Sequence, residues 1–327
     1  MIFPPRHLML TASGLASLLG SVLATPVSAA SFSQIYAFGD SLVDTGNAFA
    51  LSQSELGIGI PPEPYFEGRF SNGLVFNEYL ATDLGIPETS FGFGGASTGS
   101  LGALRFGGMT LLEVPGLLAQ VDQFVATAPS VDPDALYVLW AGFNDYFFEG
   151  VTDPFVPVGN LTSAVNTLSG AGAKNFLIGN LPDLGEVPLA GILGLPPEVV
   201  AGLNLVSNAH NQILADTVAG LDASDSLSVD LLDANSLIRA AIAGEFGFSN
   251  VSDPCTLTPS CLSNPTAQSS FLFWDQVHPT TRAYRIVADT ALAQISHNPV
   301  STPEPTAVIG LSLVAAFAAR RFQRSRA

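Results

Sequence analysis

Four short segments of this 327-residue chain carry side chains that together could catalyse acyl transfer. The first contains Ser41, the second Gly95 and the third Asn144, and in the fourth Asp275 stands three residues before His278. A serine hydroxyl is a weak nucleophile at neutral pH and needs a base such as His278 within hydrogen-bond reach. A carboxylate would orient that base, and N–H donors would receive the charge that develops on an ester carbonyl oxygen. The set predicts a serine nucleophile acting through an acyl-enzyme.

Each segment also has a structural explanation when it is taken alone. Asp40 or Ser41 would cap a helix, Gly95 would belong to a glycine-rich bend, and Asn144-Asp145 would form an Asx turn. The joint occurrence of nucleophile, base, orienting carboxylate and oxyanion donors is much harder to explain by chance, so the combination favours catalysis. Asp40 and Asp145 have no proton-transfer role in this scheme, and we expect them to brace their loops.

Short apolar runs that alternate with helical stretches must position these side chains. Strands are predicted at Gln34–Phe38, Ser90–Phe93, Ala135–Trp140, Asn175–Ile178 and Leu227–Leu231. Helices are predicted at 73–84, 116–126, 161–168, 197–221, 234–243 and 282–295. Buried strands joined by helical crossovers form a parallel sheet, so we expect one α/β domain from about residue 31 to 298. In such sheets the ligand crevice lies outside the carboxyl ends of the strands, where Ser41, Gly95 and Asn144 are found.

The four segments resemble the signature blocks of the GDSL, or SGNH, family of esterases and lipases. The blocks stand as Phe38-Gly39-Asp40-Ser41-Leu42, Phe91-Gly92-Phe93-Gly94-Gly95-Ala96, Gly142-Phe143-Asn144-Asp145 and Asp275-Gln276-Val277-His278-Pro279. Ser90 and Gly92 replace the asparagine and alanine that usually open the second block. The resemblance implies a three-layer α/β/α, flavodoxin-like SGNH-hydrolase fold with a five-stranded parallel sheet. It also implies a triad of Ser41, His278 and Asp275 and an oxyanion hole of Ser41, Gly95 and Asn144.

The activity implied by the resemblance is hydrolysis of carboxylic esters by an exported serine esterase or lipase. The same site would also suit an acyltransferase or a polysaccharide deacetylase. A different class, a non-catalytic surface or matrix binding protein on an esterase scaffold, has no physical need for all of Ser41, Asn144, Asp275 and His278, so we expect an enzyme. Aromatic residues around the blocks could line an apolar acyl pocket, which favours a lipid-like ester, or could fill the core.

Both ends of the chain have the composition of targeting signals. Residues 1–30 place Arg6 before an apolar run and end in small residues, the order of a secretory signal peptide cleaved near Ala30. Residues 301–327 resemble a PEP-CTERM sorting signal of Gram-negative bacteria, with Pro303-Glu304-Pro305, a short apolar stretch and a basic tail. The 13 uncharged residues of that stretch would span roughly 20 Å as a helix, less than the ~30 Å hydrocarbon core. We expect an exported, extracellular or cell-surface protein held transiently at the membrane, with a retained anchor as the alternative.

The charge balance argues against a nucleic-acid partner for the body of the chain. Residues 31–300 hold 6 basic and 27 acidic residues, whereas phosphate binding needs clustered Lys or Arg. Cys255 and Cys261 are the two cysteines, and in an oxidising compartment they would form one disulfide, with two free thiols as the alternative. This loop supplies too few ligands for zinc, and we expect no metal or cofactor. The expected partners are an ester substrate and the export and sorting machinery.

Overall fold

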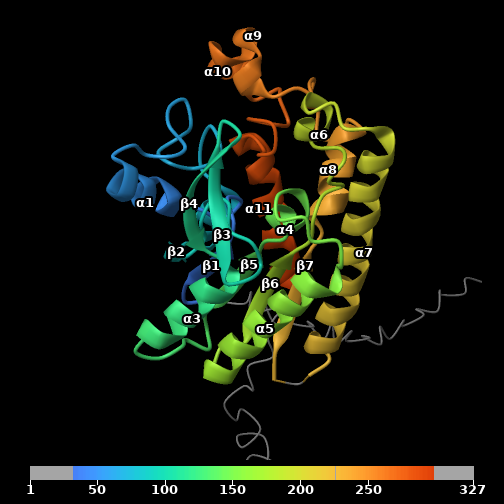
Figure 1. Ribbon diagram of the computed structural model, residues 1–327. Helices are drawn as coiled ribbons and strands as arrows, with labels where there is room; N and C mark the ends of the chain where they lie inside the picture. The colour runs from blue at the N-terminus through green and yellow to red at the C-terminus, as the bar shows by residue number, and fades with distance from the viewer. Residues whose placement is uncertain (1–31, 225, 298–327) are drawn as a thin grey trace, which may run out of the picture.

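A five-stranded, wholly parallel sheet forms the centre of the molecule (Figure 1). The computed structural model describes residues 32–224 and 226–297, so the predicted signals at 1–30 and 301–327 lie outside the described residues. The strands follow the spatial order β2-β1-β5-β6-β7. They are β1 (Ile35–Gly39), β2 (Glu88–Ser90), β5 (Leu136–Trp140), β6 (Asn175–Gly179) and β7 (Ser228–Leu232). Once the small hairpin between β2 and β5 is set aside, this is the flavodoxin-like order 2-1-3-4-5.

Helices cover both faces of the sheet because side chains along each strand alternate between the faces. Phe38, Tyr137 and Phe176 pack on one face against α3 (Leu117–Thr127), α5 (Phe155–Ala171) and α7 (Pro197–Asp222). The strand residues between them pack on the other face against α2 (Phe76–Leu84), α8 (Ala234–Ile242) and α11 (Thr281–His297). The central strands β5 and β6 are buried along their whole length. The predicted three-layer α/β/α architecture is therefore confirmed.

The second strand of the sheet begins two residues earlier than predicted, at Glu88, and ends at Ser90. Beyond it the chain still follows β1, because the Phe91 N–H donates to the Ala37 carbonyl at 2.7 Å. Gly94 then turns away from the sheet, and its N–H donates to a carboxylate oxygen of Asp44 at 2.8 Å. The glycine-rich run therefore forms a loop where the apolar pattern predicted a strand.

Several smaller elements were not predicted from the sequence. An antiparallel hairpin of β3 (Leu101–Phe106) and β4 (Met109–Pro115) follows the glycine-rich loop, and its turn is made by Gly107 and Gly108, with φ of 59° and 80°. Two adjacent glycines between extended segments are a hairpin signal that the strand pattern overlooked. The other additions are α1 (Asn47–Leu56), α4 (Phe143–Phe147), α6 (Pro188–Ile192), η1 (Cys255–Leu257), α9 (Pro259–Leu262) and α10 (Pro265–Gln268). Within residues 32–224 and 226–297, no helix combines the length and the apolar character needed to cross a membrane.

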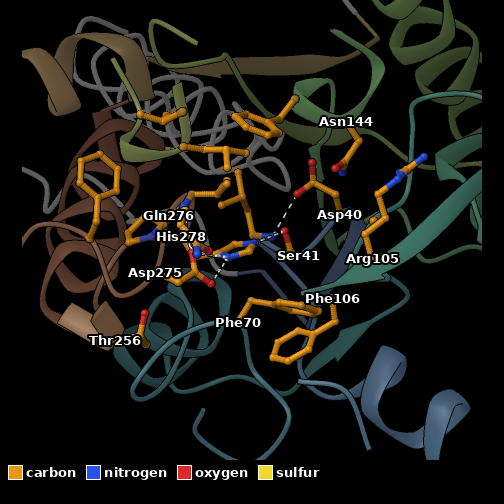
Figure 2. Close-up of a pocket in the computed structure, with 18 of the residues that line it drawn as sticks. Asp40, Ser41, Phe70, Arg105, Phe106, Asn144, Thr256, Asp275, Gln276 and His278 are labelled. Atoms are coloured by element: carbon orange, nitrogen blue, oxygen red, sulfur yellow. Dashed lines mark hydrogen bonds and ion pairs between the residues drawn. The ribbon is translucent and has the colours of Figure 1, made fainter. Parts of the chain in front are cut away.

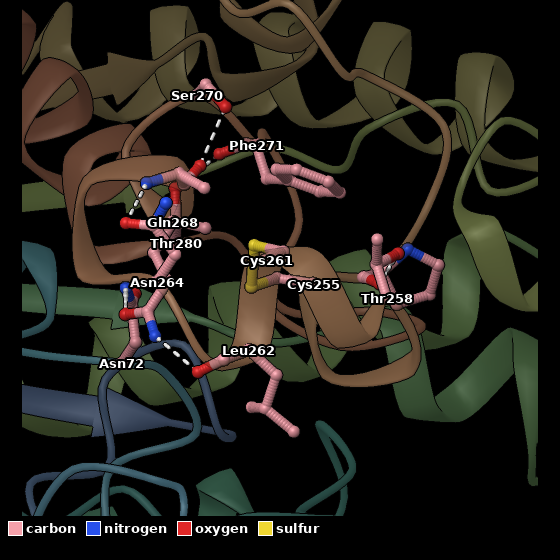
Figure 3. The surroundings of a disulfide bond; sticks show 12 residues. Asn72, Cys255, Thr258, Cys261, Leu262, Asn264, Gln268, Ser270, Phe271 and Thr280 are labelled. Atoms are coloured by element: carbon pink, nitrogen blue, oxygen red, sulfur yellow. Dashed lines mark hydrogen bonds between the residues drawn. A yellow bond between two sulfur atoms is a disulfide. The ribbon is translucent and has the colours of Figure 1, made fainter.

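The predicted disulfide joins Cys255 in η1 to Cys261 in α9 (Figure 3). Both cysteines are fully buried. The Cys255 N–H donates to the Phe273 carbonyl at 3.1 Å, and the next N–H, that of Thr256, donates to the Trp274 carbonyl at 2.9 Å. The bridged loop is thus hydrogen-bonded to the segment that leads directly into Asp275.

Candidate active site

The four predicted segments meet at the carboxyl end of the sheet (Figure 2). Ser41 follows β1, Gly95 lies in the loop after β2, and Asn144 lies in α4 directly after β5. Asp275 and His278 occupy the turn that precedes α11. That helix packs with α2 on one face of the sheet, against β1. Parallel strands end at one edge of a sheet, and this brings residues more than 200 positions apart into one cavity.

Ser41, His278 and Asp275 form a continuous hydrogen-bonded chain. The Oγ of Ser41 lies 2.7 Å from Nε2 of His278. Nδ1 of the same imidazole lies 2.7 Å from Oδ2 and 2.9 Å from Oδ1 of Asp275. Because a carboxylate only accepts, this contact places the proton on Nδ1 and leaves Nε2 as the acceptor for the serine hydroxyl. The arrangement can move a proton from Ser41 to His278 while Asp275 stabilises the resulting imidazolium.

Asp275 is held as a carboxylate despite its burial. Its Oδ1 accepts the N–H groups of Val277 at 2.8 Å and His278 at 2.7 Å, which closes the turn. Burial by itself would raise the pKa of the Asp275 carboxyl, but the facing His278 and these hydrogen bonds outweigh it and hold the pKa below its usual value. A further donor, the hydroxyl of Tyr65, reaches Oδ2 at 2.7 Å. No local pattern in the sequence pointed to Tyr65, because 210 positions separate it from Asp275.

Three residues with N–H donors line the cavity at Ser41. The N–H groups of Ser41 and Gly95 have no hydrogen-bond acceptor among the residues described. Gly95 has a φ of +86°, and a Cβ there would lie 2.2 Å from the carbonyl oxygen of Ala103, so both its conformation and its surroundings require glycine. One N–H of the Asn144 amide donates to the Ala96 carbonyl at 2.8 Å, and an amide carries a second. All three residues line the cavity, as an oxyanion hole would require.

The acidic residues near these donors brace loops, as expected for Asp40 and Asp145. Asp40 accepts the N–H of Leu42 at 3.0 Å, and Asp145 accepts the N–H of Thr98 at 2.9 Å. Burial raises the pKa of Asp40 to about 7, and it also raises the pKa of Asp145.

Asp44 has a related role that the sequence did not reveal. Its carboxylate accepts the N–H groups of Gly46, Asn47, Ala48 and Gly94, and so joins the serine loop to the oxyanion loop. Burial raises the pKa of Asp44 to about 6, although these hydrogen bonds oppose that effect.

A cavity of about 810 Å³ opens above the serine. One wall is the unpredicted β3–β4 hairpin, and α4, α6, η1, α9 and the segment of residues 62–65 also line the cavity. Its rim carries exposed apolar side chains, including Phe148, Ile192, Leu193, Leu257 and Leu262.

The aromatic residues around the blocks divide between cavity and core. Phe143, Phe148 and Phe273 line the cavity. Phe91 instead stacks on Phe38 at 5.1 Å between ring centroids, within the hydrophobic core. Both functions considered for this group of residues therefore occur.

Within residues 32–224 and 226–297, no cluster of three or more His, Cys, Asp or Glu side chains could hold a metal ion. His210, interpreted as a scaffold residue, is fully buried in α7 with Nδ1 2.9 Å from the hydroxyl of Tyr146. It lies outside the site.

A flavodoxin-like parallel sheet between two helical layers, with the signature residues gathered at the carboxyl ends of its strands, defines the class of SGNH hydrolases. The chain belongs to the GDSL-like lipase/acylhydrolase family, whose model matches residues 35–291. It is a carboxylic ester hydrolase.

Relatives with named activities are similar over most of the chain. The thermolabile hemolysin of Vibrio parahaemolyticus is 29% identical over 280 residues, which cover 79% of this chain and 63% of the hemolysin. This chain therefore spans less than two thirds of the hemolysin's length. The phosphatidylcholine-sterol acyltransferase of Aeromonas hydrophila is 28% identical over 324 residues, covering 84% of this chain and 94% of that enzyme. Among solved structures, a lipolytic G-D-S-L protein from Veillonella parvula aligns with 80% of this chain and 96% of its own at 19% identity and a TM-score of 0.47, too distant a likeness to bear on function.

Proposed function

We propose that this chain is an exported serine esterase that hydrolyses lipid-like carboxylic esters through Ser41, His278 and Asp275. The observation that carries the proposal is the continuous hydrogen-bonded chain from the Ser41 hydroxyl to the Asp275 carboxylate at the base of an apolar cavity. Nucleophile, base and orienting carboxylate are each within the distance that proton transfer requires. No bound metal or cofactor is needed for this chemistry.

In the first half of the reaction, the Oγ of Ser41 bonds to the ester carbonyl carbon while Nε2 of His278 takes the hydroxyl proton. The N–H groups of Ser41 and Gly95 and the amide of Asn144 then stabilise the charge on the carbonyl oxygen. The bond from the carbonyl carbon to the alcohol oxygen breaks, and His278 donates the proton it took from Ser41 to that oxygen. Water then attacks the acyl-enzyme with His278 again as base, which releases the carboxylic acid and restores Ser41.

The cavity supports lipid-like esters over acetylated polysaccharide. About 810 Å³ lies near the upper end of ordinary ligand pockets and is far more than an acetyl group fills. The apolar rim favours contact with an acyl chain, and Arg105, which lines the cavity, is paired with Glu149 at 3.0 Å. The acidic body also disfavours recruitment to anionic lipid surfaces, so we infer a neutral or zwitterionic ester.

Acyl transfer is the second candidate. It is supported by the similarity to the acyltransferase of Aeromonas hydrophila over most of both chains. In that reaction an acceptor alcohol takes the place of water in the second half, and the same residues act. Formation of a new ester from a lipid donor and an added alcohol, at a rate above that of hydrolysis, would identify the chain as a transferase.

The test is hydrolysis of nitrophenyl esters by the purified protein and by Ser41→Ala. We expect turnover in the parent and none above background in the folded variant. The ratio kcat/KM should rise from the acetyl ester to longer acyl chains. A preference for acetyl esters together with release of acetate from acetylated polysaccharide would contradict the lipid-like substrate, and full activity of Ser41→Ala would contradict the triad.

We further propose that export removes residues 1–30 and that residues 301–327 are a sorting signal whose basic helix is also cleaved off, leaving a hydrolase domain of about 31–298. The buried Cys255–Cys261 disulfide supports an oxidising compartment. Mass spectrometry of the exported protein tests both cleavages. Peptides that contain Met1 or Arg326 from protein at the cell surface would contradict the corresponding cleavage.

A further inference from the structure

Tyr65 is the donor that reaches the Asp275 carboxylate from a distant part of the chain. Its hydroxyl lies 2.7 Å from Oδ2. The other hydrogen bonds found for this carboxylate come from Val277 and His278, which belong to the same four-residue turn. Donors in the turn move with it, so they hold the shape of the turn without fixing the carboxylate relative to the rest of the site. Tyr65 connects it to the N-terminal half of the chain, which carries Ser41.

The phenol is a permanent donor in this position. Burial, together with the charge of Asp275, raises the pKa of Tyr65, so the hydroxyl stays protonated wherever the enzyme works. A protonated phenol that faces a carboxylate donates to it, and hydrogen bonds to charged acceptors are among the stronger ones in proteins.

The Tyr65 ring is packed among other aromatic side chains. It packs edge-on against Trp274 at 6.1 Å and against Phe106 at 6.1 Å between ring centroids. Trp274 immediately precedes Asp275 and packs with the buried disulfide. Phe70 also packs against the Tyr65 ring, and its ring centroid lies 5.1 Å from that of the His278 imidazole. Tyr65 therefore belongs to an aromatic cluster that includes Trp274, the neighbour of Asp275, and that also contacts His278, the base that Asp275 orients.

We propose that Tyr65 is a positioning residue of the triad, which fixes the Asp275 carboxylate so that the His278 imidazole keeps its alignment with Ser41; this inference rests on the proposed function. Tyr65 acts through Asp275 and makes no bond to the reacting atoms. Its contribution therefore appears in turnover, since alignment of the base matters while the bonds to Ser41 form. Substrate binding depends on the ring that lines the cavity, which phenylalanine would preserve.

The experiment compares Tyr65→Phe with Tyr137→Phe in the full-length protein, using a nitrophenyl ester. Tyr137 is the matched control because its buried ring lies in β5 and its hydroxyl donates to the Asp132 carbonyl at 2.8 Å, away from the site. Tyr65→Phe should lower kcat about tenfold and change KM less than about twofold, a smaller effect than the ~10²-fold that a 1 Å misplacement of catalytic groups can produce. Tyr137→Phe should leave both constants unchanged.

A double-mutant cycle with Asp275→Ala shows whether Tyr65 acts through the carboxylate. In that background Tyr65→Phe should change the residual kcat less than about twofold. A second readout does not require turnover: the downfield proton resonance of the His278 Nδ1–H should shift in Tyr65→Phe and stay in place in Tyr137→Phe.

The outcomes separate this inference from the proposed function. Normal kcat and an unchanged imidazole resonance in folded Tyr65→Phe would overturn the positioning role, even while Ser41→Ala is inactive. An equal loss of kcat with and without Asp275 would show that Tyr65 acts by another route. Full activity in Ser41→Ala would instead overturn the proposed function on which this inference depends.

Discussion

Replacing Asn144 by alanine separates a role in the transition state from a role in the loop. The Asn144 amide has two roles in the structure. One N–H donates to the Ala96 carbonyl at 2.8 Å, and the side chain also lines the cavity above Ser41. An oxyanion exists only after attack on the ester, so a donor to it raises turnover and leaves ground-state binding almost unchanged. The structural contact with Ala96, in contrast, contributes to the folded state at all times.

Both contributions have an expected size. Loss of one oxyanion donor lowers kcat by about 10²–10³-fold, or ~2.7–4 kcal/mol, while KM changes little when acylation limits the rate. Loss of the contact leaves the carbonyl of Ala96 without that donor in a buried setting, which lowers the free energy of unfolding by about 1–3 kcal/mol. Asn144→Ala should therefore be both slower and less stable than the parent.

Asn175→Ala is the matched control for this prediction. Asn175 has the same exposed fraction as Asn144, 6%, and its amide donates to the carbonyls of Pro133 and Ala135, but it lies at the opposite end of the sheet. We expect it to lose similar stability and to keep its turnover. Measurement of kcat, KM and melting temperature on both variants decides the matter, and a folded Asn144→Ala with near-normal kcat would remove Asn144 from the oxyanion hole.

Three further predictions follow from the loops around the site. Gly95→Ala should lower both stability and kcat, because its Cβ would meet the Ala103 carbonyl oxygen at 2.2 Å. Asp40→Asn should gain melting temperature relative to the parent as the pH rises from about 5 to 8. Burial raises the Asp40 pKa from 3.8 to about 7, so between those two values the folded protein binds more protons than the unfolded chain. The parent therefore loses stability as the pH rises toward 7, and above that pH the loss is complete. Replacing Cys255 and Cys261 together by serine should lower the free energy of unfolding by about 2 kcal/mol through loss of the short cross-link.

Each of these predictions has an internal comparison. Gly85→Ala serves for Gly95, since Gly85 also has a positive φ but open space around its Cβ position; equal effects in both would mean that backbone strain alone accounts for the loss. For Asp40, a constant difference in melting temperature from pH 5 to 8 would contradict the raised pKa. For the cysteines, a reducing agent should destabilise the parent and leave the double variant unaffected, and a parent insensitive to reduction under denaturing conditions would contradict the disulfide.

The sequence alone was enough to predict the fold class and the group of candidate catalytic residues. Buried β-strands leave continuous apolar runs, and parallel strands end at one edge, so polar residues after those runs must come together. Asp275 and His278 are three positions apart, and a contact that short is set within a single turn, as the 2.7 Å separation of Nδ1 and Oδ2 confirms. Two cysteines six positions apart were within reach of each other for the same reason.

Only the tertiary structure revealed the surroundings that hold these groups in place. Tyr65 reaches Asp275 across 210 positions, and Asp44 reaches Gly94 across 50, and neither contact follows from any local period or spacing. The β3–β4 hairpin became a wall of the cavity because of where the glycine-rich loop delivers it, and the aromatic residues divided between cavity and core according to which segments they met. Local chemistry is set by residues close in the chain, whereas alignment of the site and the shape of its cavity depend on packing between segments whose separation the sequence does not encode directly.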